Sequence, residues 1–504
     1  MTISNAVSDS ARAAIVGYKI TKGNYSLSSP NLPQRIAILS EANTDHQTGL
    51  SLTPFQATTP SDVAKVLGDG SPGYLAMRIL QPIQGGGLSG IPVWVYPVAV
   101  AGSATATVST ITITGTATDN ATHYLEIGGR VSLDGQPYVV SIVKGDTPTI
   151  IVGKYIAAIN GVYGSPVIAS GTSTLVLTAK TKGTSSIFSV VPQLGGVSAG
   201  VSYAVVTVAG TLSGDVASAL ANFQGDWNTI VINPYNDATN LSLLESVNGV
   251  PDPTNPTGRY SATLFKPFVA LYSVKDADPI TGEGTDIATR LNQCTNVFCP
   301  APNTSILPIE VAANVALLVA TIGQNSPNLD VNDQAYPDAP IDAILGKYSD
   351  YNYRDNCVKA GISTVNLSGS DLVVKDLVTT YNPTNEITPQ FSYVRNLILD
   401  WNIRYAYKLL EQVNVINHTL VPDGTVVSAP SVISPAQWKG ILHAMFDDLA
   451  DRGLIADAEF SKNSLQVAIS STNPDRFDTF FRYKRTGIAR ICSTTAEAGF
   501  YYGV

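Results

Sequence analysis

The order of apolar and polar positions predicts alternating strands and helices on both sides of a central stretch. Before that stretch, two short apolar runs rich in β-branched residues predict buried strands, RIAILSEA and IPVWVYPV. Between them lie two segments with helical periodicity, SDVAKVLGDG, for which Ser61 is the expected N-cap, and YLAMRILQPI. From Gly214 the alternation returns, with strands predicted at WNTIVINPY, FKPFVALYSV and NVFCPAP. Such alternation is typical of a sheet covered by helices, so we predict an α/β core formed by residues 31–100 and 211–380.

Residues 101–210 follow a different pattern. Thr alternates with Val and Ile at a period of two in ATATVSTITITGTA, which predicts a half-buried strand, and several similar runs follow. Turn sequences such as Asp134 with Gly135 separate these runs, and one helix is expected at VGKYIAAINGV. Only nine residues of this stretch are charged. The change in composition predicts a β-rich domain inserted into the core.

The two ends of the chain differ from both of these regions. Residues 1–30 are polar apart from one alternating stretch at 14–20, and a lone terminal strand must pair with something, so we predict an N-terminal arm. For residues 381–504 we predict a C-terminal domain with a long helix at 388–413 and a second helix capped by Ser434. An extended arm that includes FFRYKRTGIARI is expected to follow these helices. The long helix carries one stripe at i, i+4 spacing: Tyr393, Leu397, Trp401, Tyr405 and Leu409.

Composition and charge narrow the function. The chain has 504 residues, of which 14% are charged, and its net charge of −9 disfavours nucleic-acid binding, which needs a basic face. No apolar run reaches the roughly 18–20 residues that cross a bilayer, and the first residues do not form a secretory leader. We therefore expect no membrane insertion and folding in the cytoplasm of the producing cell. The low charge fits a chain that buries its faces against copies of itself.

The motifs offer no support for catalysis or ligand binding. Four cysteines and four histidines are few, and the cysteine spacing fits neither a zinc site nor a disulfide framework. The GVSAG of residues 196–200 matches a nucleophile elbow, but a strand follows it where a helix is required. The glycine-rich residues 85–90 precede a strand and contain no Lys, unlike a phosphate-binding loop. Asp447 and Asp451 share a helical face that is more typical of a solvated surface than of a metal site. We predict no catalytic residue, no cofactor and no metal.

A basic run interleaved with aromatic residues lies near the C-terminus: Phe480, Phe481, Arg482, Tyr483, Lys484, Arg485 and Arg490. Residues of these types also bind single-stranded nucleic acid by stacking and phosphate contacts. The alternation instead favours a strand with one basic face, which we expect to meet an acidic partner surface.

Residues 354–381, RDNCVKAGISTVNLSGSDLVVKDLVTTY, resemble a segment shared by contractile tail sheath proteins. In that family a short helix leads into a G-I-S-T strand, a glycine turn and a second strand that ends in T-T-Y. The matching positions here are Arg354, Gly361, Ile362, Ser363, Thr364, Gly369, Thr379, Thr380 and Tyr381. Residues 156–184 and 227–237 are similar to the inserted β domain and the returning strand of the Mu-like branch, whereas residues 323–340 lack its basic D-P-A-R-P run.

The resemblance implies an α+β multidomain fold, with an α/β-type sheath core, an outer β-rich domain at 101–210 and terminal arms that exchange strands. It also implies a structural subunit of a phage contractile tail sheath, stacked as hexameric rings around the tail tube. Contraction would drive the tube through the bacterial envelope during genome ejection. The implied partners are further copies of the chain, the tail tube protein, and baseplate and tail terminator proteins, with no nucleic acid. The implied location is the virion, after assembly in the host cytoplasm.

Three other interpretations stay open. The sheath of a type VI secretion system or of an extracellular contractile injection system fits the same residues. A secreted adhesin or carbohydrate-binding module built on residues 101–210 would need a signal peptide. An enzyme would need a site that the motifs do not supply.

The resemblance assigns residues to two kinds of contact. The strand-exchanging arms would use apolar positions at both ends of the chain: Ile15, Val16, Tyr18, Ile20, Phe481, Tyr483, Ile488 and Ile491. The tube-facing surface would use basic residues of the long helix: Arg395, Arg404 and Lys408.

Overall fold

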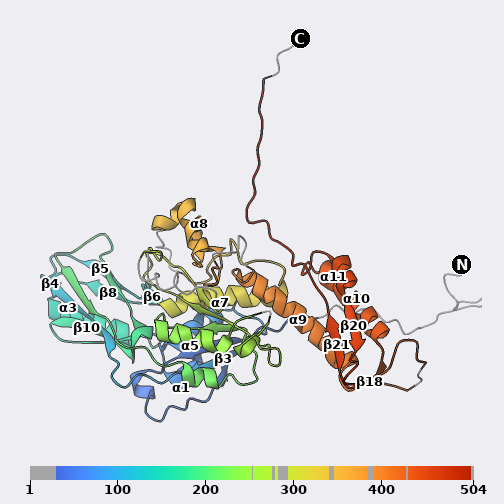
Figure 1. The fold of residues 1–504 in the computed structure, drawn as a ribbon. Coiled ribbons are helices and arrows are strands. Elements are labelled where there is room, and N and C mark those ends of the chain that lie inside the picture. The colour runs from blue at the N-terminus through green and yellow to red at the C-terminus, as the bar shows by residue number, and fades with distance from the viewer. Residues whose placement is uncertain are drawn as a thin grey trace, which may run out of the picture. The chain divides into compact units, whose positions relative to one another are not determined.

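The computed structural model describes residues 30–252, 254–274, 278–281, 293–339, 345–383, 390–426 and 429–500. The chain divides into two compact units (Figure 1). The large unit combines Asn31–Ile403 with Arg485–Val504, and the small unit combines Arg404–Lys484 with Met1–Pro30. The division falls inside helix α9 and not at residue 381, and the four-domain division expected from the sequence stays a prediction.

A six-stranded sheet forms the centre of the large unit. Its strand order is β15-β14-β13-β1-β3-β2, and all neighbours are parallel except the edge pair β2 and β3. The strands span Ile36–Ser40 (β1), Phe55–Ala57 (β2), Val93–Pro97 (β3), Ile230–Ile232 (β13), Val269–Tyr272 (β14) and Asn296–Phe298 (β15). Every residue of β1 is buried, as expected for a parallel strand covered on both faces. The predicted mixture of helices and sheets is therefore confirmed.

Helices and a hairpin accompany this sheet. The helices span Pro60–Leu67 (α1), Pro72–Leu80 (α2), Ala217–Ala221 (α4), Ala238–Asn248 (α5), Pro308–Asn325 (α7) and Tyr351–Lys359 (α8). Helix α7 packs against α2, β13 and β14. The N-cap of α1 is Thr59 and not the predicted Ser61, because Thr59, two residues earlier, forms a reciprocal capping box with Asp62. After α8, strands β16 (Thr364–Ser368) and β17 (Asp371–Asp376) form the strand, turn and strand expected at residues 354–381.

Residues 101–210, named here the β-rich segment, form sheets separate from the central one. The order is β12-β4-β10-β9 in the larger sheet and β11-β5-β8 in the smaller, with β6 and β7 as a hairpin. The elements span Ala106–Thr114 (β4), Ala121–Ile127 (β5), Ser132–Leu133 (β6), Gln136–Pro137 (β7), Val139–Ile142 (β8), Pro148–Asn160 (α3), Val167–Ser170 (β9), Thr174–Lys182 (β10), Val190–Gln193 (β11) and Ser202–Val208 (β12). Half-buried and buried residues alternate along all of β10. The predicted period of two and the single helix are confirmed.

The β-rich segment leaves the core after β3 and returns before β13, the two strands that flank β1. Its two ends meet in a neck closed by bridges between Ala99 and Asp215 and between Thr105 and Thr211. At Gly183 the backbone has a φ of +102°, and a Cβ there would lie 2.8 Å from the carbonyl oxygen of Leu212. The neck therefore requires glycine at this point.

A buried carboxyl group lies beneath the neck. Glu41 directly follows β1, is 0% exposed and accepts a hydrogen bond from the Ser185 hydroxyl. Burial raises its pKa to about 7, although hydrogen bonds from Ser185, Tyr235 and the Gly214 backbone oppose the rise. The carboxyl ends of parallel strands around a reversal of strand order are the usual place for ligands in such sheets. Here the chain's own neck fills that place.

A second link joins the β-rich segment to the helices. Arg130, which follows β5, donates to Asp338 at 2.8 Å and to Glu310 of α7 at 3.1 Å. Arg78 of α2 donates to Asp134 at 2.9 Å and to Asp338 at 3.2 Å. The Glu310 side chain is 1% exposed, so its charge depends on these arginines.

The small unit contains the second half of α9 (Val394–Asn414), two further helices and two small sheets. The remaining elements span Thr419–Leu420 (β18), Val432–Ile433 (β19), Pro435–Asp451 (α10), Ala458–Ser464 (α11), Gln466–Ile469 (β20) and Phe477–Phe480 (β21). Ser434 caps α10 as predicted, and Gln437 completes the capping box. Strands β20 and β21 pair antiparallel as a two-stranded sheet.

Replacing Glu41 by Gln should remove a pH-dependent loss of stability. The pKa of this carboxyl is about 7 in the folded chain against 4.5 ordinarily, so the wild type loses free energy of unfolding as the pH rises from below 4.5 through 7. The loss is at most about 3 kcal/mol. Gln does not ionise, so E41Q should be more stable than the wild type at pH 8 in urea denaturation, with a flatter pH profile. E497Q, which changes an exposed carboxylate, serves as the control. A pH profile of E41Q that matches the wild type would contradict the assignment.

Candidate assembly surfaces

The end of the described chain is an extended, solvent-exposed segment. Residues 485–500, named here the C-terminal extension, follow the small unit in sequence but belong to the large unit. No helix or strand occurs in these residues, and all ten residues from Ile491 to Phe500 are exposed. Figure 1 shows them as a single extended trace. An exposed, extended backbone such as that of residues 491–500 is suited to pairing with another strand.

Arg485 holds the start of the extension. Its Nε donates to Asp400 Oδ1 at 2.7 Å, and a second nitrogen of the same guanidinium donates to Asp400 Oδ2. Nη1 also donates to the carbonyl of Gln390 at 3.0 Å. The pair is bidentate and its side chains are only 21% and 14% exposed, which favours a fixed geometry.

Arg490 holds the extension five residues later. Its guanidinium pairs with Asp330 and lies 3.7 Å from the ring centroid of Tyr393. Between these two points, Arg395 donates to the Thr486 hydroxyl at 2.7 Å and to the carbonyl of Asn328 at 2.9 Å. Arg395 thus connects the extension with the loop that contains Asp330.

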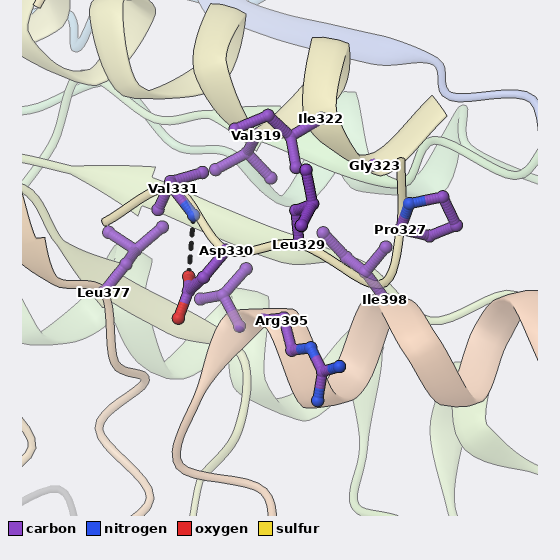
Figure 2. Close-up of a pocket in the computed structure, with 11 residues that line it drawn as sticks. Val319, Ile322, Gly323, Pro327, Leu329, Asp330, Val331, Leu377, Arg395 and Ile398 are labelled. Atoms are coloured by element: carbon purple, nitrogen blue, oxygen red, sulfur yellow. Dashed lines mark hydrogen bonds between the residues drawn. The ribbon is translucent and has the colours of Figure 1, made fainter. Parts of the chain in front are cut away.

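An apolar cavity lies beside this contact (Figure 2). Val319 and Ile322 of α7 line it together with Leu329 and Ile398, and Asp330 and Arg395 supply the charged groups. The Asp330 carboxylate accepts a hydrogen bond from the Val331 amide at 2.7 Å. The apolar walls and this hydrogen bond hold the carboxylate that Arg490 meets.

The small unit contains a two-stranded sheet supported by aromatic side chains. Phe481, directly after β21, lies 5.2 Å from Phe446 of α10 and 5.7 Å from Tyr407 of α9 between ring centroids. The indole of Trp438 donates to the Thr479 hydroxyl at 3.1 Å. The hairpin is therefore fixed on α9 and α10.

The structure places the predicted arm residues differently. Ile15, Val16, Tyr18 and Ile20 lie outside the described residues. Phe481 and Tyr483 are half-buried and lie in the small unit, where their rings contact each other. Ile488 is half-buried in the extension, and Ile491 is 85% exposed. The residues that hold the extension are distant in sequence, and local periodicity gave no indication of them.

The predicted tube-facing residues also differ from one another. Arg404 and Lys408 are half-buried on α9, and the Arg404 guanidinium lies 5.9 Å from the Tyr407 ring. Arg395 is 5% exposed, and its donors are used by Thr486 and Asn328. Its guanidinium is thus hydrogen-bonded inside the large unit, and the expected tube-facing role of Arg395 stays a prediction.

The groups that resembled catalytic or ligand-binding motifs have structural contacts. Cys294, Cys299 and Cys357 are buried, and burial raises the pKa of the Cys294 thiol to about 11 and that of Cys357 to about 12. The carbonyl of Val197 in the GVSAG turn lies 2.9 Å from a ring nitrogen of His123. Asp447 forms an ion pair with Lys462 at 2.6 Å. Across the described ranges, no group of three or more potential ligands is arranged to hold a metal ion. No described helix is long and apolar enough to cross a membrane.

Comparison with known proteins points to one class, the phage tail sheath proteins. A homologue of the chain is the Mu-like prophage FluMu tail sheath protein of Haemophilus influenzae, which is 24% identical over 414 residues. The alignment covers 77% of this chain and 78% of that protein, and it confirms the predicted resemblance to the Mu-like family. No model of a protein family matches the chain.

Two solved structures are also similar. The sheath tail protein from Desulfitobacterium hafniense aligns with 93% of this chain and 100% of its own, at 13% identity and a TM-score of 0.44. A chain of the anti-feeding prophage baseplate aligns with 97% of this chain and 100% of its own, at 10% identity and a TM-score of 0.47.

Replacing Phe481 by Ala should destabilise the small unit. The change removes a ring that contacts Phe446 and Tyr407, so we expect a loss of about 1–3 kcal/mol, below the range for fully buried phenylalanines. The neighbouring F480A is the matched control, because Phe480 is 51% exposed. Hydrogen exchange of α10 amides measures the effect. Equal exchange in F481A and F480A would contradict the supporting role of Phe481.

Proposed function

We propose that this chain is the sheath subunit of a phage contractile tail. Copies would stack as hexameric rings around a tail tube and contract to drive the tube through the bacterial envelope during genome ejection. The observation that carries the proposal is the match to a tail sheath protein over 77% of the chain. The exposed C-terminal extension supplies a physical means of linking copies.

The acceptor for the extension would be the hairpin of β20 and β21 in a neighbouring copy. A two-stranded sheet offers two outer edges, and an added strand would pair with the backbone groups along such an edge. The N-terminal arm of another copy would use the second edge. Each added main-chain hydrogen bond contributes roughly 0.5–1.5 kcal/mol net, so a strand of several residues supplies a specific link.

The hydrogen-bonding pattern of the hairpin identifies its outward amides. The Ser470 amide donates to the Arg476 carbonyl at 2.9 Å, which makes this a hydrogen-bonded pair. Because such pairs alternate in an antiparallel ladder, Ile469 of β20 and Phe477 of β21 direct their backbone groups outward. These groups would receive the incoming strands.

A link of this kind suits a polymer that changes length. Main-chain ladders fix the pairing of two strands but leave the packing of whole units free to change, so neighbours would stay joined while rings rotate and approach. The free energy of contraction would then come from repacked interfaces. Arg404 and Lys408 remain our candidates for the tube-facing surface, and the β-rich segment would lie outermost. Baseplate and tail terminator proteins would bind the two ends of the polymer.

Deleting residues 491–504 should leave a folded chain that does not polymerise. The deletion removes exposed residues of the extension while the contacts of Arg485 and Arg490 remain, so the circular dichroism spectrum should match that of the full chain. Negative-stain microscopy should show tubes for the full chain and for C492S, the control that keeps the extension, and none for the deletion. Normal tubes from the truncated chain would overturn the arm assignment.

Replacing Ile469 by Pro should weaken polymerisation without unfolding the hairpin. The substitution removes an outward N–H, and proline is tolerated at the outer positions of an edge strand. I469V keeps the donor and is the matched control. We expect the concentration required for tube formation to rise about tenfold for I469P, equivalent to the loss of one or two hydrogen bonds between copies. An unchanged requirement, with the same result for F477P, would exclude both edges as acceptors.

A further inference from the structure

We infer that Arg490, Asp330 and Tyr393 form a clamp that sets where the C-terminal extension leaves the large unit. On this inference the clamp makes Ile491 the first free residue, and these three are positioning residues for the arm. The use of the free part by a neighbouring copy rests on the proposed function, but the clamp itself is a property of the single chain.

The first support is the change in burial at residue 490. The Arg490 side chain is 15% exposed and that of its partner Asp330 is 5% exposed. From Ile491, which is 85% exposed, every residue to Phe500 is exposed. Half-buried residues alternate with exposed ones up to Arg490, and none of the residues from 491 to 500 is half-buried.

The second support is the way in which residues 485–490 are held. Apart from a β-bridge at Arg485 they form no helix or strand, so their positions depend largely on side-chain contacts. Charged side chains supply the contacts: Arg485 to Asp400, Arg395 to Thr486, and Arg490 to Asp330. Planar guanidinium groups specify both distance and angle, which a single apolar contact does not.

The third support is that the carboxylate and the ring of the clamp are themselves fixed. Asp330 accepts from the Val331 amide and lies at the wall of the apolar cavity in Figure 2. Tyr393 directly precedes α9, and its ring lies 3.7 Å from the Arg490 guanidinium carbon. A cation over an aromatic face in a partly desolvated place adds to the ion pair.

The clamp determines the length of the tether between copies. If Arg490 and Arg485 were released, the free chain would lengthen by six residues, or roughly 20 Å of reach. A longer tether lowers the effective concentration of the arm at its acceptor and permits more than one spacing between copies. The clamp would thus favour regular rings over loosely connected chains.

Spin labelling at Cys492 tests the clamp on the unassembled chain. Cys492 is exposed, whereas Cys294, Cys299 and Cys357 are buried, so a thiol-directed label reports the motion two residues beyond Arg490. In the wild type we expect the label at Cys492 to move more slowly than a label at residue 499, because the clamp fixes the chain two residues before it. In R490Q and in D330N we expect the rotational correlation time of the Cys492 label to shorten about twofold or more, because the chain at residue 490 would then move like a loop. The double variant should match the singles because both act on one contact.

Three controls make the outcome decisive. R476Q breaks an exposed ion pair with Asp478 and should leave the label unchanged. A label at G499C in a C492S background should be mobile in every variant. R490K keeps the charge but loses the fork, so it should fall between the wild type and R490Q. If R490Q or D330N misfolds by circular dichroism, Y393L tests the same contact through its ring.

Label motion at Cys492 in the wild type as fast as at residue 499, or no change in R490Q, D330N and Y393L, would overturn the clamp. The result is independent of the proposed function, because it is measured without polymer. Tubes from the chain lacking residues 491–504 would refute the arm and leave the clamp standing. A mobile Cys492 label in the wild type would refute the clamp and leave the arm standing.

Discussion

The fold of the large unit depends on the two ends of the β-rich segment meeting at one strand, β1. The β-rich segment leaves beside β1 and returns beside β1, so its ends must meet over the end of that strand. Bringing the ends of a long segment together costs conformational entropy, and the bridges at Thr105 and Thr211 and at Ala99 and Asp215 hold them. Gly214 allows a close approach, since a Cβ there would lie 2.6 Å from the Tyr235 hydroxyl. Without this closure β3 and β13 could not both flank β1.

A neck alone would leave the β-rich segment free to rotate, and a second attachment prevents this. Arg130 and Asp134 of the segment meet Arg78, Glu310 and Asp338 of the core at a place separate from the neck. Burying these charges is costly, so the cluster contributes more to orientation than to net stability. The neck and the cluster together attach the segment to the core at two separate places, which restricts its direction relative to the central sheet.

Local periodicity predicted the elements well where the pattern of burial is regular. Alternating burial along β10 follows from the alternation of its sequence, and the cap at Ser434 follows from the residues that come after it. Contacts between distant residues had no such basis. A charged residue such as Arg395 on an amphipathic helix is expected at the surface. It is buried instead, because the Asn328 carbonyl and the Thr486 hydroxyl accept hydrogen bonds from its guanidinium. A period of 3.6 residues indicates a face of a helix, but not what covers that face.

The same limit applies to the root of the extension. The C-terminal arm expected from the sequence stays a prediction, and the pairing of Arg490 with Asp330 joins positions 160 residues apart, which no local pattern indicates. On the proposed function, the two parts of the extension would also use different physical means. Ion pairs with planar groups specify one geometry and suit a fixed point of departure. Main-chain ladders depend little on side chains and suit a contact that must persist while its surroundings move. A subunit that keeps its neighbours through a change of packing needs both, with the specific contact inside the chain and the adaptable one between chains.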